Sequence, residues 1–432
     1  MPVATVDPEI FRKIFDDHWS EFTRTHVAYA TEYYTEVVQK MLGCGREAGG
    51  YTEYRCGHCG VDVRRVAFTC KSCFCLSCAK VYTDDFVVQV SRVLQPGLIY
   101  RHMVLTVPEQ LRLTFYRDRA TGKLLSAFMK CGHQCLEAVV RTVVRQPVKI
   151  GTIVVVQTHG RSGHYNPHLH IIMTSGGINE RTGKWVELGY FPYEIIHKKW
   201  QYHLFNLLKV EVPTPAMGAL INDLYAKYPQ GLVAHVTKGT VPERCRGLAK
   251  YLAKYVASPP IAVRRILSYT GSEVTYWYQD HRTKGKEEVT VPVSTFMGRM
   301  VQHLLPKGFQ RIRYYGLHAT KMLQKWACAI KEGLRKIGRQ IKGTYQIVAG
   351  KHYRERYQES SGCDPLRCRY CGHDMVVWRR WHPKNGTIYD EVEQIKAGRY
   401  EPVAPECAAG VRGPAVWATP GGIPLPLSTL WS

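Results

Sequence analysis

The sequence lacks any run of about 18 apolar residues without charged side chains, which a membrane-spanning helix would require. Its first residues, MPVATVDPEIFRKIFDDHWSEF, contain no apolar segment of the kind that a secretory signal carries. No internal repeat is present, so a solenoid is not expected. These absences exclude a membrane-spanning or secreted protein of the usual kind and predict a cytoplasmic one.

Acidic residues are few. The chain of 432 residues has 35 Asp and Glu against 59 Lys and Arg, a formal net charge of +24. The excess is spread along the whole chain, which favours a polyanionic partner, and nucleic acid is the commonest of these. A merely basic enzyme or a membrane-surface protein is the alternative. With 45% hydrophobic residues the chain can bury a sizeable core in two or more domains.

The order of apolar patterns predicts the fold class. Strands are expected at 100–107, 149–159, 167–175 and 231–239, and helices at 7–42, 84–94, 108–118, 125–146, 192–210, 215–228 and 242–257. From residue 100 this order fits an α+β fold, a ferredoxin-like antiparallel sheet with helices on one face. A strand pair follows, and then helices near 293–305 and 319–340.

These patterns divide the chain into six segments. We expect an N-terminal helix (1–43), a zinc-binding domain (44–82), a core with a late helix (83–265), a strand pair with C-terminal helices (266–345), a possible zinc-knuckle segment (346–399) and a Pro/Gly-rich tail (400–432).

Cysteine spacing predicts structural zinc. Seven of the fifteen cysteines lie between Cys44 and Cys78, and paired Cys-x-x-Cys in an intracellular chain indicates a metal site. The first expected site combines two such pairs: Cys56, Cys59, Cys75 and Cys78. A second is expected from the remaining candidates: Cys70, Cys73 and Cys44, with His58. Buried free cysteines are the alternative.

A later pair forms half of a similar site. Cys368 and Cys371 have Cys363 nearby, with His373 or His382 as a possible further ligand. The zinc interpretation and a non-metal one stay equally open at this pair.

Two histidines lie one residue apart in the apolar stretch YNPHLHII. On a strand His168 and His170 point to one face, whereas Leu169 and Ile171 point to the other. Two adjacent imidazoles can chelate one divalent cation, although two separately hydrogen-bonded histidines are the alternative. Ile172 stands where a His-x-His-x-Asp-His hydrolase needs Asp and a histidine-triad hydrolase needs His, so both classes are excluded.

A third ligand must come from elsewhere in the chain. Gln157 and His164 are the nearest candidates, and both stay open. Mixed nitrogen and oxygen ligands suit Mg²⁺ or Mn²⁺ when a phosphate supplies further oxygens.

The stretch LAKYLAKYVAS carries two tyrosines on one helix face. Tyr251 and Tyr255 are four residues apart, and Lys250 and Lys254 repeat the same step beside them. A phenol with a pKa of about 10 is a poor nucleophile unless a cation or base assists the loss of its proton. Attack on a phosphodiester would give a phosphotyrosine and a free 3′-hydroxyl. An ordinary amphipathic core stripe is the alternative.

Several segments together resemble a known family. FCLSCAK, HMVLTVPEQLR, NPHLHIIM, YLAKYVASPPIA and RIRYYGLHA are similar to blocks of the rolling-circle transposases of the insertion-sequence ninety-one family, within the HUH (His-hydrophobic-His) superfamily. The resemblance spans roughly residues 40–340, and the tyrosines are those of its two-tyrosine type. In the family block CKxRxFCPSC, this chain has CKSCFCLSC: the Arg and Pro are missing and Cys73 is extra, so the family pattern does not fix which of these cysteines are the zinc ligands.

The resemblance implies an HUH endonuclease core and a transposase that nicks single-stranded DNA at element ends. It implies that His168 and His170 bind a catalytic Mg²⁺ or Mn²⁺, that Tyr251 and Tyr255 are alternating nucleophiles, and that zinc is structural. It also implies a bacterial, nucleoid-associated protein whose zinc domain binds DNA. Basic candidates for gripping the strand are Lys250, Lys254, Arg264, Arg265, Arg311 and Arg313, although a solvated basic face explains the arginines equally well.

Three other functions compete. A rolling-circle replication initiator or relaxase shares the chemistry, but the N-terminal cysteine pairs argue against it. A non-catalytic zinc-dependent DNA-binding regulator needs no His pair. A transposase built on three carboxylates is not excluded by spacing, yet it explains neither the histidines nor the tyrosines.

Overall fold

The computed structural model describes residues 7–94, 97–236, 247, 249–251, 253, 259–280, 283, 285–336 and 350–398. Its largest sheet is antiparallel throughout, with strand order β11-β4-β5-β3-β7 and β6 paired to β5. The strands are β3 (Tyr100–Thr106), β4 (Val148–His159), β5 (Tyr165–Asn179), β6 (Trp185–Glu187), β7 (Ala234–Val236) and β11 (Ile312–Gly316). The first strand of the sheet, β3, lies between the third and the last strand of the β-α-β-β-α-β unit, as in a ferredoxin-like fold. The predicted fold class is confirmed.

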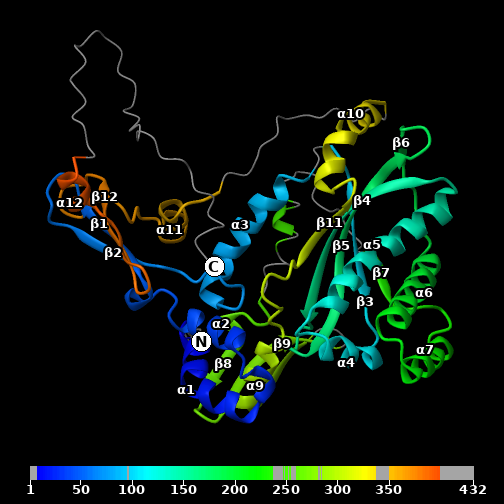
Figure 1. The fold of residues 1–432 in the computed structure, drawn as a ribbon, viewed down its shortest axis with the longest axis horizontal. Helices are drawn as coiled ribbons and strands as arrows, with labels where there is room; N and C mark the ends of the chain where they lie inside the picture. The colour runs from blue at the N-terminus through cyan, green and yellow to red at the C-terminus, as the bar shows by residue number, and fades with distance from the viewer. Residues whose placement is uncertain are drawn as a thin grey trace, which may run out of the picture.

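Four helices cover one face of this sheet: α4 (Glu109–Arg117), α5 (Lys123–Val144), α6 (Tyr193–Glu211) and α7 (Pro215–Lys227). In Figure 1, α6 and α7 lie to the right of the sheet. Alternate strand residues such as Leu169 and Ile171 are fully buried against them. Gly132 of α5 allows this close packing, because a Cβ there would lie 2.5 Å from a Leu169 methyl carbon.

The opposite face is covered too, so the expectation of helices on one face was incomplete. α3 (Ala79–Ser91), α10 (Thr320–Lys336) and the helical residues Ala249 and Ala253 pack there against Ile153, Val155 and Ile172. Along these strands both the odd and the even positions are apolar, which is typical of a sheet buried on both faces. This second face carries the histidines.

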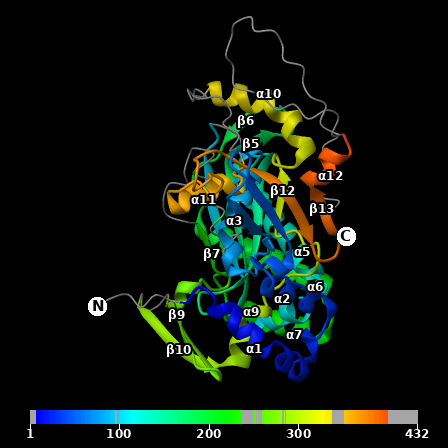
Figure 2. The same cartoon turned by 90° about the vertical axis from the view of Figure 1, so that its left-hand side faces the viewer.

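A second core joins the N-terminal helices to a small sheet. α1 (Ile10–Thr25) and α2 (Glu32–Leu42) pack with β8 (Ile266–Tyr269), β9 (Glu273–Gln279), β10 (Lys286–Pro292) and α9 (Val293–Val301); Figure 2 shows α1, α9, β9 and β10 together at the bottom of the molecule. The single helix predicted over 7–42 is wrong. The chain turns between Thr25 and Glu32, and the Thr31 hydroxyl caps α2 by accepting from the Tyr34 amide.

Two hairpins far apart in the chain share a third sheet, of order β13-β12-β1-β2. β1 (Tyr51–Cys56) and β2 (Val63–Ala67) pair there with β12 (Met375–His382) and β13 (Gly386–Asp390), next to α11 (Tyr353–Ser361) and α12 (Glu391–Lys396). Figure 1 shows this unit at the far left, away from the large sheet. The tail predicted from residue 400 lies outside the described residues. Among the helices that are described, none is both long and apolar enough to cross a bilayer.

Gly316, at the end of β11, provides a test of this packing. Its φ is +59°, and a Cβ there would lie 1.8 Å from the Ile150 carbonyl oxygen. We expect Gly316→Ala to lower the free energy of unfolding by more than about 2 kcal/mol, measured as a fall in the thermal midpoint. In Gly218→Ala, where the added methyl meets nothing within 4 Å on α7, the midpoint should stay or rise. Equal midpoints for the two variants would contradict the packing of β11 against β4.

Candidate active site

The histidine pair lies on β5, on the face opposite the four-helix layer. His168 is the register partner of Gln157 on β4, and His170 is the partner of Val155. The Gln157 side-chain oxygen Oε1 lies 3.0 Å from Nε2 of His168 and 3.1 Å from Nε2 of His170. Of the two candidates for a third ligand, the structure therefore brings Gln157 to the pair, whereas His164 is exposed in the turn before β5.

The hydrogen bonds orient these donor atoms toward one point. Nδ1 of His168 lies 2.7 Å from the Asn166 carbonyl oxygen. A carbonyl only accepts, so this nitrogen carries the proton and donates, and the lone pair is on Nε2. Burial lowers the pKa of His168 and holds the pKa of His170 well below its ordinary value, which keeps both rings neutral.

The amide of Gln157 is held as well, because its Nε2 lies 3.0 Å from Nε2 of His159. The Gln157 side chain is thereby held with its amide group facing Nε2 of both His168 and His170. The donor set of two imidazole nitrogens and an amide oxygen fits a divalent metal such as Mg²⁺ or Mn²⁺ when phosphate oxygens complete the coordination.

A third histidine, which the sequence analysis missed, connects this set to a tyrosine. His102 lies on β3 two residues from Val104, the register partner of His170, so the two imidazoles share a face. Nε2 of His102 is 3.0 Å from Nδ1 of His170, and its Nδ1 is 2.8 Å from the hydroxyl oxygen of Tyr251. The ring is only 2% exposed, and burial lowers the pKa of His102 to about 4. Alternation along YRHMVLTV places His102 on one face of its strand, but only the pairing of β3 with β5 shows that this face is shared with His170.

Tyr251 is half-buried beside this histidine. Its neighbours Ala249 and Ala253 are buried against the sheet, and Lys250 is exposed. The second predicted nucleophile, Tyr255, and Lys254 lie outside the described residues. The structure thus connects four sequence-predicted residues. His102 contacts Tyr251 and His170, and Gln157 contacts His170 and His168.

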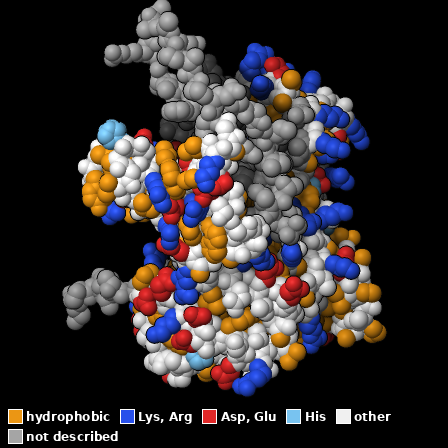
Figure 3. All heavy atoms as spheres, turned by 60° about the vertical axis from the view of Figure 1, so that its left-hand side comes forward, with side chains coloured by type: hydrophobic (Ala, Val, Ile, Leu, Met, Phe, Trp, Pro, Cys, Tyr) orange, Lys and Arg blue, Asp and Glu red, His pale blue; other side chains and the backbone are white. Residues whose placement is uncertain are grey.

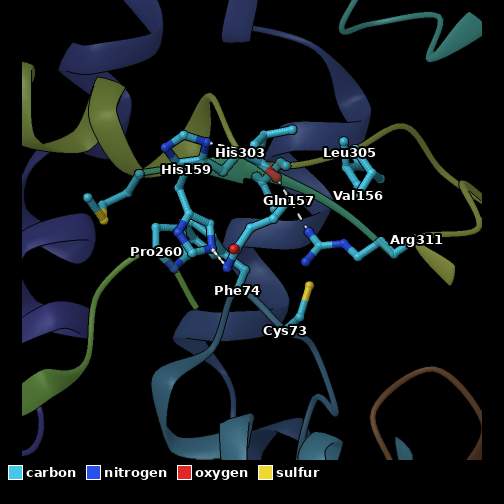
Figure 4. Close-up of a pocket in the computed structure, with 12 residues that line it drawn as sticks. Cys73, Phe74, Val156, Gln157, His159, Pro260, His303, Leu305 and Arg311 are labelled. Atoms are coloured by element: carbon cyan, nitrogen blue, oxygen red, sulfur yellow. Dashed lines mark hydrogen bonds between the residues drawn. The ribbon is translucent and has the colours of Figure 1, made fainter. Parts of the chain in front are cut away.

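A pocket opens beside Gln157 and His159 (Figure 4). Its wall includes Arg311, which precedes β11, Pro260, and Cys73 and Phe74 from the cysteine-rich segment. The guanidinium of Arg311 lies 3.4 Å from the carbonyl oxygen of His303. Arg313, by contrast, donates to the hydroxyl of Ser126 at 2.8 Å on the other side of the sheet. Of these two predicted arginines, Arg311 is the one that lines the pocket with Gln157 and His159.

The other predicted arginines lie beside the small sheet. Arg265 and Lys286 both lie over the ring of Trp277, at 5.4 Å from its centroid, and Arg264 is exposed. Figure 3 shows Lys and Arg spread over the visible face with Asp and Glu between them. On this face the positive charge is not confined to one patch.

The cysteines form two groups of four, with a pairing that differs from the predicted one. One group is Cys44, Cys70, Cys75 and Cys78, and the other is Cys56, Cys59, Cys368 and Cys371. The prediction that Cys56 and Cys59 share a site with Cys75 and Cys78 is wrong. The β1–β2 hairpin carries the first pair to its tip, whereas Cys78 ends the short helix η3 (Leu76–Cys78) next to Cys44, at 3.4 Å between sulfurs.

Three further predicted ligands lie elsewhere. Among the residues that the structure describes, Cys73 joins neither group, since it lines the pocket beside Arg311. His58 stacks on His373, with ring centroids 4.0 Å apart, next to the second group. Cys363 is exposed and outside both groups.

Comparison with known proteins agrees with these features. Residues 14–107 match the family model described as "Transposase zinc-binding domain", which includes all cysteines from Cys44 to Cys78. Residues 151–325 match the model described as "Putative transposase", which includes the histidine pair and Tyr251. The matched zinc-binding domain and the cysteine groups support structural zinc.

Curated relatives are similar over most of their length. The transposase for insertion sequence element IS801 of Pseudomonas savastanoi pv. phaseolicola is 29% identical over 355 residues, which is 79% of this chain and 82% of the relative. The putative transposase y4qJ of Sinorhizobium fredii is 24% identical over 399 residues, or 87% and 96%. No solved structure matches the chain. The zinc-binding domain thus precedes the transposase domain along this chain, and together these matches show a transposase similar to those of the IS91 family.

Proposed function

We propose that this transposase nicks and rejoins single-stranded DNA at element ends through a 5′-phosphotyrosine, with Tyr251 as the first nucleophile. One observation carries the proposal: the hydrogen-bond chain from the Tyr251 hydroxyl through His102 to His170. This chain connects a nucleophile candidate to a donor set that fits a divalent cation. A buried tyrosine hydroxyl needs some hydrogen-bond partner; here that partner is a histidine that also contacts His170 of the metal-ligand candidates.

The proposed step is a displacement at phosphorus. The Tyr251 hydroxyl oxygen forms a bond to phosphorus, and the bond from phosphorus to the 3′ oxygen breaks. One proton leaves the phenol and one is taken up by the departing 3′ oxygen, so the step has no net proton change. The phosphodiester energy stays in the phosphotyrosine, and a 3′-hydroxyl can later reverse the reaction without ATP.

The surrounding residues would orient these groups. His102 holds the phenol oxygen at 2.8 Å and acts as a positioning residue. His168, His170 and Gln157 would hold Mg²⁺ or Mn²⁺, and such an ion would supply Lewis-acid polarisation of the scissile phosphate. Tyr255 follows Tyr251 by four residues in the sequence and would serve the second cleavage.

Basic and aromatic side chains would bind the strand. Arg311 at the pocket and exposed Lys250 beside Tyr251 are the nearest candidates for phosphate contacts. Arg264, Arg265 and Trp277 form a more distant basic and aromatic surface suited to an unpaired strand. The zinc-binding domain would contact the DNA of the element end.

The polarity of the linkage tests the proposal. Oligonucleotides from the DNA flanking the gene are labelled at either end and incubated with the protein and Mn²⁺. We expect the 3′-labelled piece to move into the protein band on a denaturing gel, and the 5′-labelled piece to be released with a 3′-hydroxyl that a polymerase extends. A label retained from the 5′ side, or no adduct with any strand, would contradict the proposal.

His102 is expected to affect the rate at this site. His102→Phe keeps a ring of similar size but removes both nitrogens that contact Tyr251 and His170. We expect adduct formation to slow by roughly 10–100-fold, as for other residues that orient ligands and reacting groups. The initial rate is measured at saturating Mn²⁺, so weaker cation binding alone does not explain a loss. His203→Gln on α6, across the sheet, is the control. A wild-type rate in His102→Phe would remove this residue from the mechanism.

A further inference from the structure

We propose that Cys56, Cys59, Cys368 and Cys371 bind a second zinc ion, which fastens residues 350–398 to the N-terminal strands. The matched zinc-binding domain ends at residue 107, and the matched transposase domain ends at residue 325. Half of the ligands of this site therefore come from a segment that neither family description includes. We call this group the clasp.

The sulfur positions suit a shared metal. Cys56 and Cys371 have sulfurs 3.4 Å apart, and Cys59 and Cys368 have sulfurs 3.6 Å apart. A disulfide would need about 2 Å. Four thiolates at about 2.3 Å around one tetrahedral zinc are separated by about 3.8 Å. All four sulfurs lie within 4.8 Å of one another, as one ion requires.

The two halves of the clasp have the same backbone geometry. In CGHCG the Gly60 amide donates to the Cys56 carbonyl at 3.1 Å, and in CRYCG the Gly372 amide donates to the Cys368 carbonyl at 3.1 Å. Both glycines have φ near the left-handed region, +70° and +71°. In each half an amide also donates to the first sulfur at 3.4 Å, from Cys59 and from Tyr370. Two equivalent knuckles facing each other form a complete four-thiolate site.

Contacts around the clasp bridge the same two segments. The buried carboxylate of Asp62 accepts from the Arg369 amide at 2.9 Å and from its guanidinium at 3.0 Å. Arg64 donates to the carbonyls of Pro365 and Arg367. β1 and β12 pair directly, with Cys56 opposite Met375. His58 and His373 stack beside the site, and with Cys371 they form an alternative three-ligand set.

The clasp would fix more than the sheet itself. The C-terminal helix α11 contacts α3 through Arg356, whose guanidinium lies 3.8 Å from the Asp84 carboxylate and 2.5 Å from that of Asp85. α3 packs on the face of the large sheet that carries the histidines. Zinc at the clasp would therefore also help to hold residues 350–398, through α11, against α3 on the face of the large sheet that carries the histidines.

The zinc content of the full chain, measured by native mass spectrometry, tests the proposal. We expect two ions in the wild type and one in each double variant, Cys56→Ser/Cys59→Ser and Cys368→Ser/Cys371→Ser. The quadruple variant should also keep one, because both pairs serve the same ion. The control Cys328→Ser/Cys363→Ser changes two exposed cysteines outside both groups and should keep two.

A wild-type count of one zinc ion, a double variant that keeps two ions, or a quadruple variant that falls below one ion would overturn the proposal.

Amide hydrogen exchange tests whether the zinc ion holds the C-terminal strands in place or only binds to the cysteines. In Cys368→Ser/Cys371→Ser we expect exchange in β12 to rise by about tenfold or more, with exchange in β4 and β5 unchanged. Unchanged exchange in β12 would show that the ion does not hold the C-terminal strands. A double variant His58→Ala/His373→Ala that loses an ion would transfer the site to the alternative ligand set and overturn the assignment to four cysteines.

Discussion

In Tyr251→Phe we expect the covalent adduct with single-stranded DNA to fall by about a thousand-fold or more, as when other nucleophiles are removed. The substitution takes away only the hydroxyl oxygen, which lies 2.8 Å from Nδ1 of His102. The ring remains to pack beside Ala249 and Ala253, so the fold should survive. The buried nitrogen left without this partner costs about 1–3 kcal/mol, which a thermal melt will register.

The assay for this variant is the 3′-labelled adduct on a denaturing gel. Tyr190→Phe, at a side chain that is 72% exposed, is the matched control and should form wild-type adduct. Tyr251→Phe/Tyr255→Phe should form none. An undiminished adduct in Tyr251→Phe, together with its loss in Tyr255→Phe alone, would assign the first cleavage to Tyr255. An adduct that persists in the double variant would defeat the tyrosine mechanism.

The second large effect concerns the cation. His168→Ala and His170→Ala each remove one of the donor atoms that converge on Gln157. We expect each variant to lose Mn²⁺ binding by isothermal titration calorimetry and to nick DNA at least about 100-fold more slowly. Gln157→Ala removes the neutral oxygen donor and should weaken Mn²⁺ binding by roughly 10–100-fold.

The alternative third ligand serves as the control in this series. His164→Ala changes an exposed histidine in the turn before β5 and should leave both Mn²⁺ affinity and nicking unchanged. Loss of cation binding in His164→Ala would move the third ligand there. Nicking that survives in His168→Ala without bound Mn²⁺ would separate catalysis from the histidine pair.

Local patterns predicted the parts of the fold that alternation and order alone determine. The strand predicted over 100–107 became β3, and the stretch over 149–159 became β4, because alternating or β-branched segments of this length favour strands. The shared face of His168 and His170 follows from the period of two along a strand. Helical spacing likewise predicted that Tyr251 is a candidate nucleophile, but it gave no sign of His102 at the Tyr251 hydroxyl.

Other features depended on contacts between distant segments. His102 is a lone histidine in an apolar strand, and only the β3–β5 register places it beside His170. The pairing of the cysteines was predicted wrongly because two Cys-x-x-Cys pairs at a spacing along the chain that suits zinc were assumed to share an ion. The hairpin of β1 and β2 separates them, and the partner of Cys56 is 315 residues further along the chain.

By itself, the sequence determined most strands and helices of the large sheet, the candidate residues for binding metal or attacking a phosphate, and the family that these residues resemble. Periodicity and spacing act over one strand or one helical turn, so they can be read along the chain. Only the tertiary structure decided which cysteines share a site, which side chain completes the histidine set, and what lies at the tyrosine hydroxyl. Those choices depend on strand register and helix packing between segments far apart in the chain, which local patterns do not encode.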